Sequence, residues 1–329
     1  MTTYKSELDL LETEIAIKYI KDTFEKELAK ALNLTRVSAP LFVFPETGLN
    51  DNLNGVERAV KFDIKDLKRD VEIVQSLAKW KRNALYRYDF KEGTGLYTDM
   101  NAVRRDETLD ELHSVYVDQW DWEKIISEKN RTKAYLKSTV RKIYKAFLRT
   151  ADKLYVKYPA LKTEFPKEIT FVSTKELEKE YPDLSRKERE NIAAEKYGAI
   201  FLTEIGWDLK DKAPHDGRAA DYDDWKLNGD ILLWYKEKKI AFEISSMGIR
   251  VDAKSLVKQL NKRKENYKLE NPYCKSILEN KLPLTIGGGI GQSRICMYLL
   301  KKAHIGEVQA SVWNEKSVQE YAEKGINLL

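Results

Sequence analysis

The chain has 329 residues, with 58 basic and 53 acidic side chains and a formal net charge of +5. Because this small excess is spread along the whole sequence, no basic footprint for a nucleic acid is predicted. No stretch approaches the roughly 20 apolar residues of a membrane helix, and two cysteines without a metal-ligand pattern indicate reduced thiols. We therefore expect a soluble, cytoplasmic protein that neither enters a membrane nor binds nucleic acid.

The first predicted element is a long amphipathic helix over residues 8–32, whose apolar side chains recur near the helical period. Its core face is predicted to consist of Leu11, Ile15, Phe24, Leu28 and Leu32. A short strand and Pro40 follow this helix. Residues 49–55 then form a turn-rich loop, in which Asp51 suits either an Asx turn or a binding role.

A basic helix is predicted from residue 76, after strands at residues 56–64 and 70–74. Ser76 is the expected N-cap of this helix. Lys79, Lys81 and Arg82 give it a dense positive charge, which suits either a solvated face or a binding site.

A polar hairpin is predicted next, with strands at residues 96–105 and 112–123 around an acidic loop. Strand alternation places one set of side chains on a common face, namely His113, Val115, Val117, Gln119 and Asp121. Burying Gln119 and Asp121 is unfavourable unless something polar binds there. His113 taken alone suits a structural role equally well.

The middle of the chain is predicted to be scaffold. A second amphipathic helix covers residues 132–158, and a strand covers residues 169–172. Capping boxes that begin at Ser173 and Ser185 open two shorter helices, and the second helix ends at Gly198 before another strand.

Residues 215–225 form a polar loop with aromatic side chains, which suits either a site or a solvated surface. Strands at residues 229–235 and 240–246 follow, joined by a polar turn.

If Tyr235 pairs with Ile240, Asp230 should face Ser245 and Glu243 should face Leu232. Asp230 and Glu243 should then share one face within reach of one ion. A magnesium ion that bridges ATP phosphates would satisfy both carboxylates; two solvated strand-end carboxylates are the alternative.

The last notable stretch, residues 285–294, contains four glycines followed by Arg294 and an apolar helix. Glycines let a backbone approach a ligand closely, and Arg294 adds a planar cation. The run lacks the ending of a P-loop and the spacing of a dinucleotide fingerprint. Its pattern of Gly287, Gly289, Gly291 and Arg294 resembles motif 3 of the class II aminoacyl-tRNA synthetases.

The companion motifs of that superfamily have counterparts upstream. The first helix with Pro40 resembles motif 1, and the hairpin that carries Arg104 resembles motif 2. Longer stretches resemble the ammonia-dependent asparagine synthetases, the aspartate-ammonia ligase family. These stretches are residues 76–82, 113–123, 221–225, 242–252 and 285–294.

The resemblance implies an α+β fold with a mainly antiparallel sheet flanked by helices, forming a single catalytic domain over residues 1–329. It also implies a homodimer with the first helix and the motif 1 region at its interface. The implied reaction uses L-aspartate, ammonia and ATP with magnesium, and yields L-asparagine, AMP and pyrophosphate through an aspartyl-β-adenylate.

The resemblance also assigns roles to individual residues. The catalytic residues would be Arg104, Arg294, Asp51 and Gln119. The amino acid would be bound by Asp51, Ser76, Lys81, Gln119, Asp121, Tyr222, Asp223, Ser246 and Arg294. ATP would be bound by Arg104, His113, Asp230, Glu243, Gly289, Gly291 and Arg294, and Asp230 and Glu243 would hold the metal.

Two choices stay open at this point. Lys81 or Arg294 suits the carboxylates of aspartate, and Asp51 or Asp121 suits its ammonium group. An aspartyl- or asparaginyl-tRNA synthetase and a non-catalytic synthetase paralogue are the rival functions.

Overall fold

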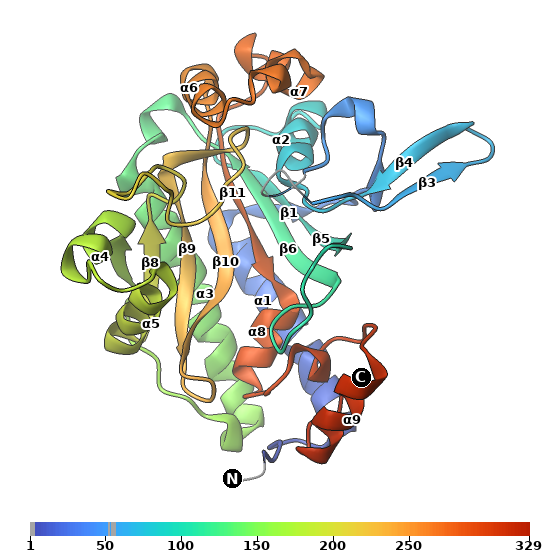
Figure 1. The fold of residues 1–329 in the computed structure, drawn as a ribbon, viewed down its shortest axis with the longest axis vertical. Helices are drawn as coiled ribbons and strands as arrows, with labels where there is room; N and C mark the ends of the chain where they lie inside the picture. The colour runs from blue at the N-terminus through green and yellow to red at the C-terminus, as the bar shows by residue number, and fades with distance from the viewer. Residues whose placement is uncertain (1–3, 52, 54–56) are drawn as a thin grey trace.

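A computed structural model describes residues 4–51, 53 and 57–329, and their main feature is one large sheet (Figure 1). Within these residues eight strands lie in the order β1-β5-β6-β11-β10-β9-β8-β7. Their bounds are β1 Leu34–Arg36, β5 Gly95–Val103, β6 Tyr116–Ile125, β7 Thr170–Ser173, β8 Ala199–Thr203, β9 Asp223–Tyr235, β10 Ile240–Arg250 and β11 Thr285–Gly291. The outermost pairs, β1 with β5 and β7 with β8, are parallel, and the pairs between them are antiparallel. The predicted α+β class with a mainly antiparallel sheet is therefore confirmed.

Helices flank this sheet, and a small second sheet projects from its β5 side (Figure 1). The helices are α1 Leu10–Leu32, α2 Ala78–Arg87, α3 Lys133–Lys157, α4 Thr174–Glu180, α5 Arg186–Tyr197, α6 Ala253–Arg263, α7 Pro272–Leu278, α8 Gln292–Leu299 and α9 Glu315–Glu323. The second sheet consists of β2 Phe42–Val43, β3 Lys61–Ile64 and β4 Arg69–Ile73. Residues 52 and 54–56, which include the start of one predicted strand, lie outside the described residues.

One face of the large sheet is closed by helices α1, α3 and α8, which share a single apolar core with it. The rings of Phe24 on α1 and Trp120 on β6 lie 4.8 Å apart in this core. Trp122, two residues further along β6, points to the same face and is fully buried. Because strand side chains alternate, Gln119 and Asp121 must point to the opposite face.

That opposite face is covered by helices at its two ends. Helix α2 packs over Leu96 and Met100 of β5, and helices α4 and α5 pack over Ile200 and Leu202 of β8. The strip between them, formed by β6, β11 and β10, is the floor of the candidate site.

The predicted core face of the first helix is wrong at its N-terminal end. Leu11 and Ile15 are 71% and 47% exposed, whereas Ala16, Ile17 and Ile20 are buried. Thr13 lies on the same buried face because its hydroxyl accepts a hydrogen bond from the ammonium group of Lys302. The polar residue Thr13 therefore lies on the buried face of the helix, whereas the apolar pattern had predicted Leu11 and Ile15 there.

Other local predictions are confirmed. The capping boxes at Ser173 and Ser185 are both present, and Gly198 ends α5 with a φ of 73°. Tyr235 pairs with Ile240 across the turn between β9 and β10.

In the described part of the chain, no helix combines the length and apolarity needed to cross a membrane.

Candidate active site

A cavity of about 440 Å³ opens over the uncovered strip of the sheet. Its walls come from α2, the loop between β5 and β6, the loop before β9 and the start of α8. The predicted site residues that line it are Ser76, Lys81, Arg104, His113, Gln119, Asp121, Tyr222, Asp223, Glu243, Ser246, Gly289, Gly291 and Arg294. Asp51 and Asp230, in contrast, lie beside this cavity rather than in its lining.

The glycine run forms β11, which lies between β6 and β10 in the large sheet. A Cβ atom on Gly287 would lie 1.8 Å from Oε2 of Glu123, and one on Gly289 would lie 2.3 Å from Oε1 of Gln119. These glycines therefore make room for long polar side chains of β6. Because these glycines have no side chains, they also leave space above β11 at the floor of the cavity.

Helix α2 is not a solvated basic helix, because Lys79, Lys81 and Arg82 are all buried. Lys79 Nζ lies 3.0 Å from a carboxylate oxygen of Asp221. The Arg82 guanidinium donates hydrogen bonds of 2.8 Å to the carbonyls of Pro283 and Val251.

Lys81 forms an ion pair with Asp121 and donates a 2.9 Å hydrogen bond to the Gly288 carbonyl. Burial lowers the pKa of Lys81, although Asp121 opposes this effect. Charge density along the sequence could not reveal burial, because the partners of these cations come from distant strands and loops.

Ser76 precedes the cap position, which Leu77 occupies, so the predicted N-cap is one residue off. Its hydroxyl still accepts a 3.1 Å hydrogen bond from the backbone N–H of Ala78. Ser76 thereby fixes the start of α2 at the edge of the cavity.

A buried charge cluster of Arg250, Glu123 and Asp223 was missed by sequence reasoning. Arg250 Nη2 lies 2.7 Å from Glu123 Oε2, and its Nη1 contacts Asp223 2.5 Å away. Burial raises the pKa of Glu123, but Arg250 more than offsets this and holds that pKa below its usual value. The sequence signal that could have revealed this cluster is the alternation of side chains along a strand, which puts Glu123 on the same face as Gln119 and Asp121.

Arg104 follows β5 and is held by a 2.8 Å hydrogen bond from its backbone N–H to the Val115 carbonyl. Among the described residues, its buried Nε atom has no hydrogen-bond partner. His113 lies in the loop before β6 and not on the strand, with Nδ1 2.9 Å from Asp110. The predicted common face is therefore wrong for His113, because β6 begins only at Tyr116.

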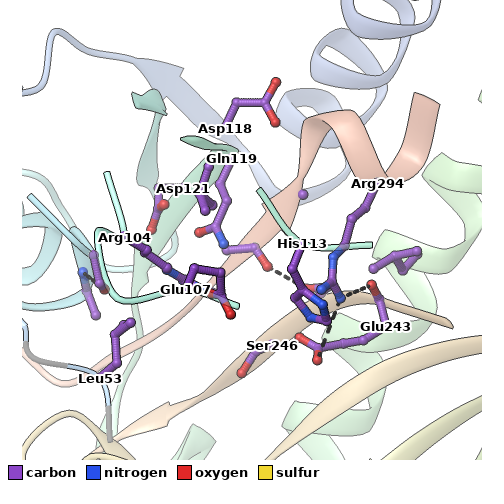
Figure 2. A pocket seen from close by; sticks show the side chains of 18 of the residues that line it. Leu53, Arg104, Glu107, His113, Asp118, Gln119, Asp121, Glu243, Ser246 and Arg294 are labelled. Atoms are coloured by element: carbon purple, nitrogen blue, oxygen red, sulfur yellow. Dashed lines mark hydrogen bonds and ion pairs between the residues drawn. The ribbon is translucent and has the colours of Figure 1, made fainter. Parts of the chain in front are cut away.

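Arg294 lies in the first turn of α8 and points toward β10, where Figure 2 shows it beside Glu243. Its Nη1 donates a 2.9 Å hydrogen bond to the Glu243 carbonyl and lies 3.9 Å from Oε2 of the same residue. The guanidinium also lies over the Phe242 ring, 5.7 Å from its centroid. Arg294 is also part of the cavity lining.

Asp230 and Glu243 share one face of the sheet, but the predicted register is wrong at one position. Glu243 pairs with Leu232 as predicted, whereas Asp230 pairs with Ser246 because a bulge lies between Glu243 and Ser245. Arg218, from the loop before β9, forms an ion pair with Asp230. Burial raises the pKa of Asp230, and Arg218 opposes this effect.

Asp230 and Glu243 are the oxygen donors available for a magnesium ion. Oδ1 of Asp230 is buried and has no hydrogen-bond partner among the described residues. Those residues contain no group of three or more acidic, histidine or cysteine side chains that could hold a metal. Two carboxylates still fit magnesium, since this ion usually takes its other ligands from phosphates and water.

Asp51 is almost fully buried and lines an adjoining cavity with Asn50, Glu72 and Gln75. Its Oδ1 accepts a 3.1 Å hydrogen bond from the Leu53 N–H, which is the expected Asx turn. Its other oxygen has no partner within the described part of the chain. Burial raises the pKa of Asp51 to about 6, and Asp221 adds to the shift.

Comparisons with known proteins show the fold and the family of this chain. Solved asparaginyl-tRNA synthetases share the fold: the Pyrococcus horikoshii enzyme complexed with asparaginyl-adenylate matches with a TM-score of 0.67 and 15% identity over 92% of this chain and 70% of that chain. An aspartate-ammonia ligase of Clostridium tetani is 59% identical over 99% of this chain and 96% of its own length. One of Fusobacterium nucleatum is 58% identical over 99% of both. Since the aspartate-ammonia ligase profile also matches residues 11–325, the chain belongs to that family.

Proposed function

We propose that this chain catalyses the ATP-dependent amidation of L-aspartate with ammonia, which yields L-asparagine, AMP and pyrophosphate. The observation that carries this proposal is one cavity with two chemically different regions. Arg104 and Arg294 line it, Nε of Arg104 has no partner among the described residues, and a buried pair of Lys81 and Asp121 lies on its floor. The first region suits a phosphate chain, and the second suits an amino acid.

The reaction would proceed in two steps. An oxygen of the aspartate side-chain carboxylate attacks the α-phosphorus of ATP, and the bond to the pyrophosphate oxygen breaks. Ammonia then attacks the acyl carbon of the aspartyl-β-adenylate, loses a proton and releases AMP. Negative charge grows on phosphate oxygens in the first step, where Arg104 and Arg294 would stabilise it.

Magnesium would be held by Asp230 and Glu243, which share one sheet face beside the cavity. When bound, the ion would neutralise charge on the phosphate oxygens. His113, Gly289 and Gly291 would complete the nucleotide site, since all three line the cavity.

The amino acid would lie on the floor of the cavity. Asp121 has one oxygen on Lys81 and a second that lacks a partner among the described residues, so it would accept the aspartate ammonium group. Lys81, fixed by the Gly288 carbonyl, would balance a substrate carboxylate. The remaining contacts would come from cavity-lining polar side chains, namely Ser76, Gln119, Tyr222, Asp223 and Ser246.

The function is tested by supplying the full chain with ATP, L-aspartate and isotope-labelled ammonium. We expect label in the side-chain amide of asparagine and one AMP formed per asparagine. Formation of ADP would contradict the adenylate route. Aspartate attached to added tRNA, or no product at all, would favour one of the two rival functions.

Asp51 would collect ammonium and accept its proton, because its free oxygen is buried next to Tyr222 and its pKa is raised to about 6. A raised carboxyl pKa means that the binding-competent anion forms only as pH rises through about 6. We therefore expect kcat/KM for ammonium to rise across that pH. The Asp51→Asn variant should lose this rise and about tenfold or more of kcat/KM at pH 7.

The matched control is Asp183→Asn, which removes an exposed carboxylate far from the cavity lining. Both variants are compared with the unmodified chain at equal total ammonium, so that changes in free ammonia cancel. An Asp51→Asn variant with the original pH profile would rule out this role.

We also propose that residues 1–329 form a single catalytic domain that works as a homodimer. One sheet takes strands from both halves of the chain, which supports a single domain. Leu10, Leu11 and Ile15 leave an apolar stripe exposed on α1, which supports its role at the interface. Sedimentation equilibrium tests the dimer, and a monomer at all concentrations would contradict it.

We further propose that the protein is cytoplasmic. The free thiols of Cys274 and Cys296 support this location.

A further inference from the structure

Arg218 is a third arginine at the cavity, and neither the sequence motifs nor the two-arginine mechanism assigns it a task. It lies in the loop before β9, lines the cavity, and has a side chain only 13% exposed. A long cation is seldom buried unless a partner or a ligand meets its charge.

Its partners in this structure account for only part of its hydrogen-bonding capacity. Nη2 contacts Asp230, and Nη1 donates a 3.2 Å hydrogen bond to the Gly217 carbonyl. Asp216 lies 3.6 Å from Nη1 and is mostly exposed. Nε is buried and has no partner among the described residues. A guanidinium has five N–H donors, so this one is under-used.

The surroundings of Arg218 identify what would use the remaining donors. Asp230 and Glu243 both act electrostatically on it, and these are the carboxylates proposed to hold magnesium beside the phosphates. Glu243 in turn contacts Arg294. Arg218, from the loop before β9, and Arg294, from the first turn of α8, therefore flank the same acidic pair.

We infer that Arg218 binds the pyrophosphate portion of ATP, with its planar fork directed at the β- and γ-phosphate oxygens. This inference rests on the proposed function. A triphosphate carries more negative charge than two arginines neutralise, and a guanidinium matches phosphate geometry through paired N–H donors. Asp230 holds the guanidinium at the cavity wall.

The other anion that Arg218 could meet is a carboxylate of aspartate, because Arg218 also acts on Tyr222 and Asp223. Aspartate has a cation of its own in Lys81, fixed by Asp121 at the floor. The acidic pair beside Arg218, in contrast, would hold magnesium, an ion that usually takes phosphate oxygens as its other ligands. The phosphate chain is therefore the occupant that the charges favour.

The experiment measures binding by calorimetry in EDTA, with pyrophosphate as one ligand and AMP plus asparagine as the other. Arg218→Gln is expected to weaken pyrophosphate binding by about ten- to hundredfold and leave AMP with asparagine unchanged. Arg218→Lys keeps the charge but loses the planar pair of donors, so its pyrophosphate affinity should fall between those of Arg218→Gln and the unmodified chain. Asp216→Asn, which removes an exposed partner, should match the unmodified chain.

A double variant separates contact from charge masking, because Arg218→Gln also uncovers the Asp230 carboxylate. If Arg218 only masks that charge, Arg218→Gln with Asp230→Asn will recover pyrophosphate affinity, and the inference is overturned. Unchanged pyrophosphate affinity, or a loss confined to aspartate affinity, would overturn it as well. Melting temperatures of each variant detect misfolding. An unmodified chain that makes no asparagine would instead refute the proposed function.

Discussion

Arg104→Ala is expected to slow adenylate formation by about 10²- to 10³-fold while substrate binding changes much less. The reason is that a preorganised donor stabilises charge that grows mainly in the transition state, which corresponds to roughly 3 to 4 kcal/mol. The buried Nε of Arg104 has no partner among the described residues, so little of the native structure depends on it. Exchange of labelled pyrophosphate into ATP, with aspartate present and ammonia absent, measures this step alone.

Arg105→Ala is the matched control for that variant. Arg105 is the next residue in the same loop, is exposed and is not part of the main cavity lining. Its removal changes the net charge by the same amount, so a general charge effect would slow both variants equally. Equal rates in the two variants would refute the role of Arg104.

Arg250→Met is expected to lower the free energy of unfolding by about 3 to 5 kcal/mol. Arg250 is 2% exposed, and its loss would leave the buried carboxylates of Glu123 and Asp223 without the cation that pairs with both. Methionine keeps much of the side-chain volume, so the change isolates the charge. Urea denaturation at neutral pH provides the measurement.

Because Arg250 holds the pKa of Glu123 below its usual value, its removal lets that pKa rise. The deficit of Arg250→Met should therefore shrink as pH falls and the stranded carboxylates take up protons. Arg149→Met is the control: Arg149 pairs with Glu27 but is 45% exposed, and exposed pairs contribute about 1 kcal/mol or less. If Arg250→Met lowered the free energy of unfolding by only that small amount, the cluster of Arg250, Glu123 and Asp223 would not be an important source of stability at the cavity floor.

Residues close together in the sequence could be predicted because local rules govern them. Capping at Ser173 and Ser185, the end of α5 at Gly198 and the pairing of Tyr235 with Ile240 depend on a few neighbouring residues. The order of the three motifs indicated the synthetase superfamily, and longer contiguous stretches indicated the aspartate-ammonia ligase family, to which the chain belongs. The spacing and composition of nearby residues are therefore enough to predict such features.

Contacts between distant residues were decided by the tertiary structure alone. The bulge after Glu243 moved the partner of Asp230 from Ser245 to Ser246, and no local signal marks such an extra residue. The Thr13 hydroxyl occupies a core position because Lys302 reaches it from the other end of the chain.

The sequence by itself therefore determined most strands of the large sheet, the two long helices and the family. Only packing decided which charges are buried and with what. Arg218, Arg250 and Lys79 look like ordinary surface cations in the sequence, yet each pairs with a carboxylate from another element. The physical reason is that the pattern of apolar residues reports which side of an element faces inward, whereas the partner of a buried charge depends on how whole elements pack together.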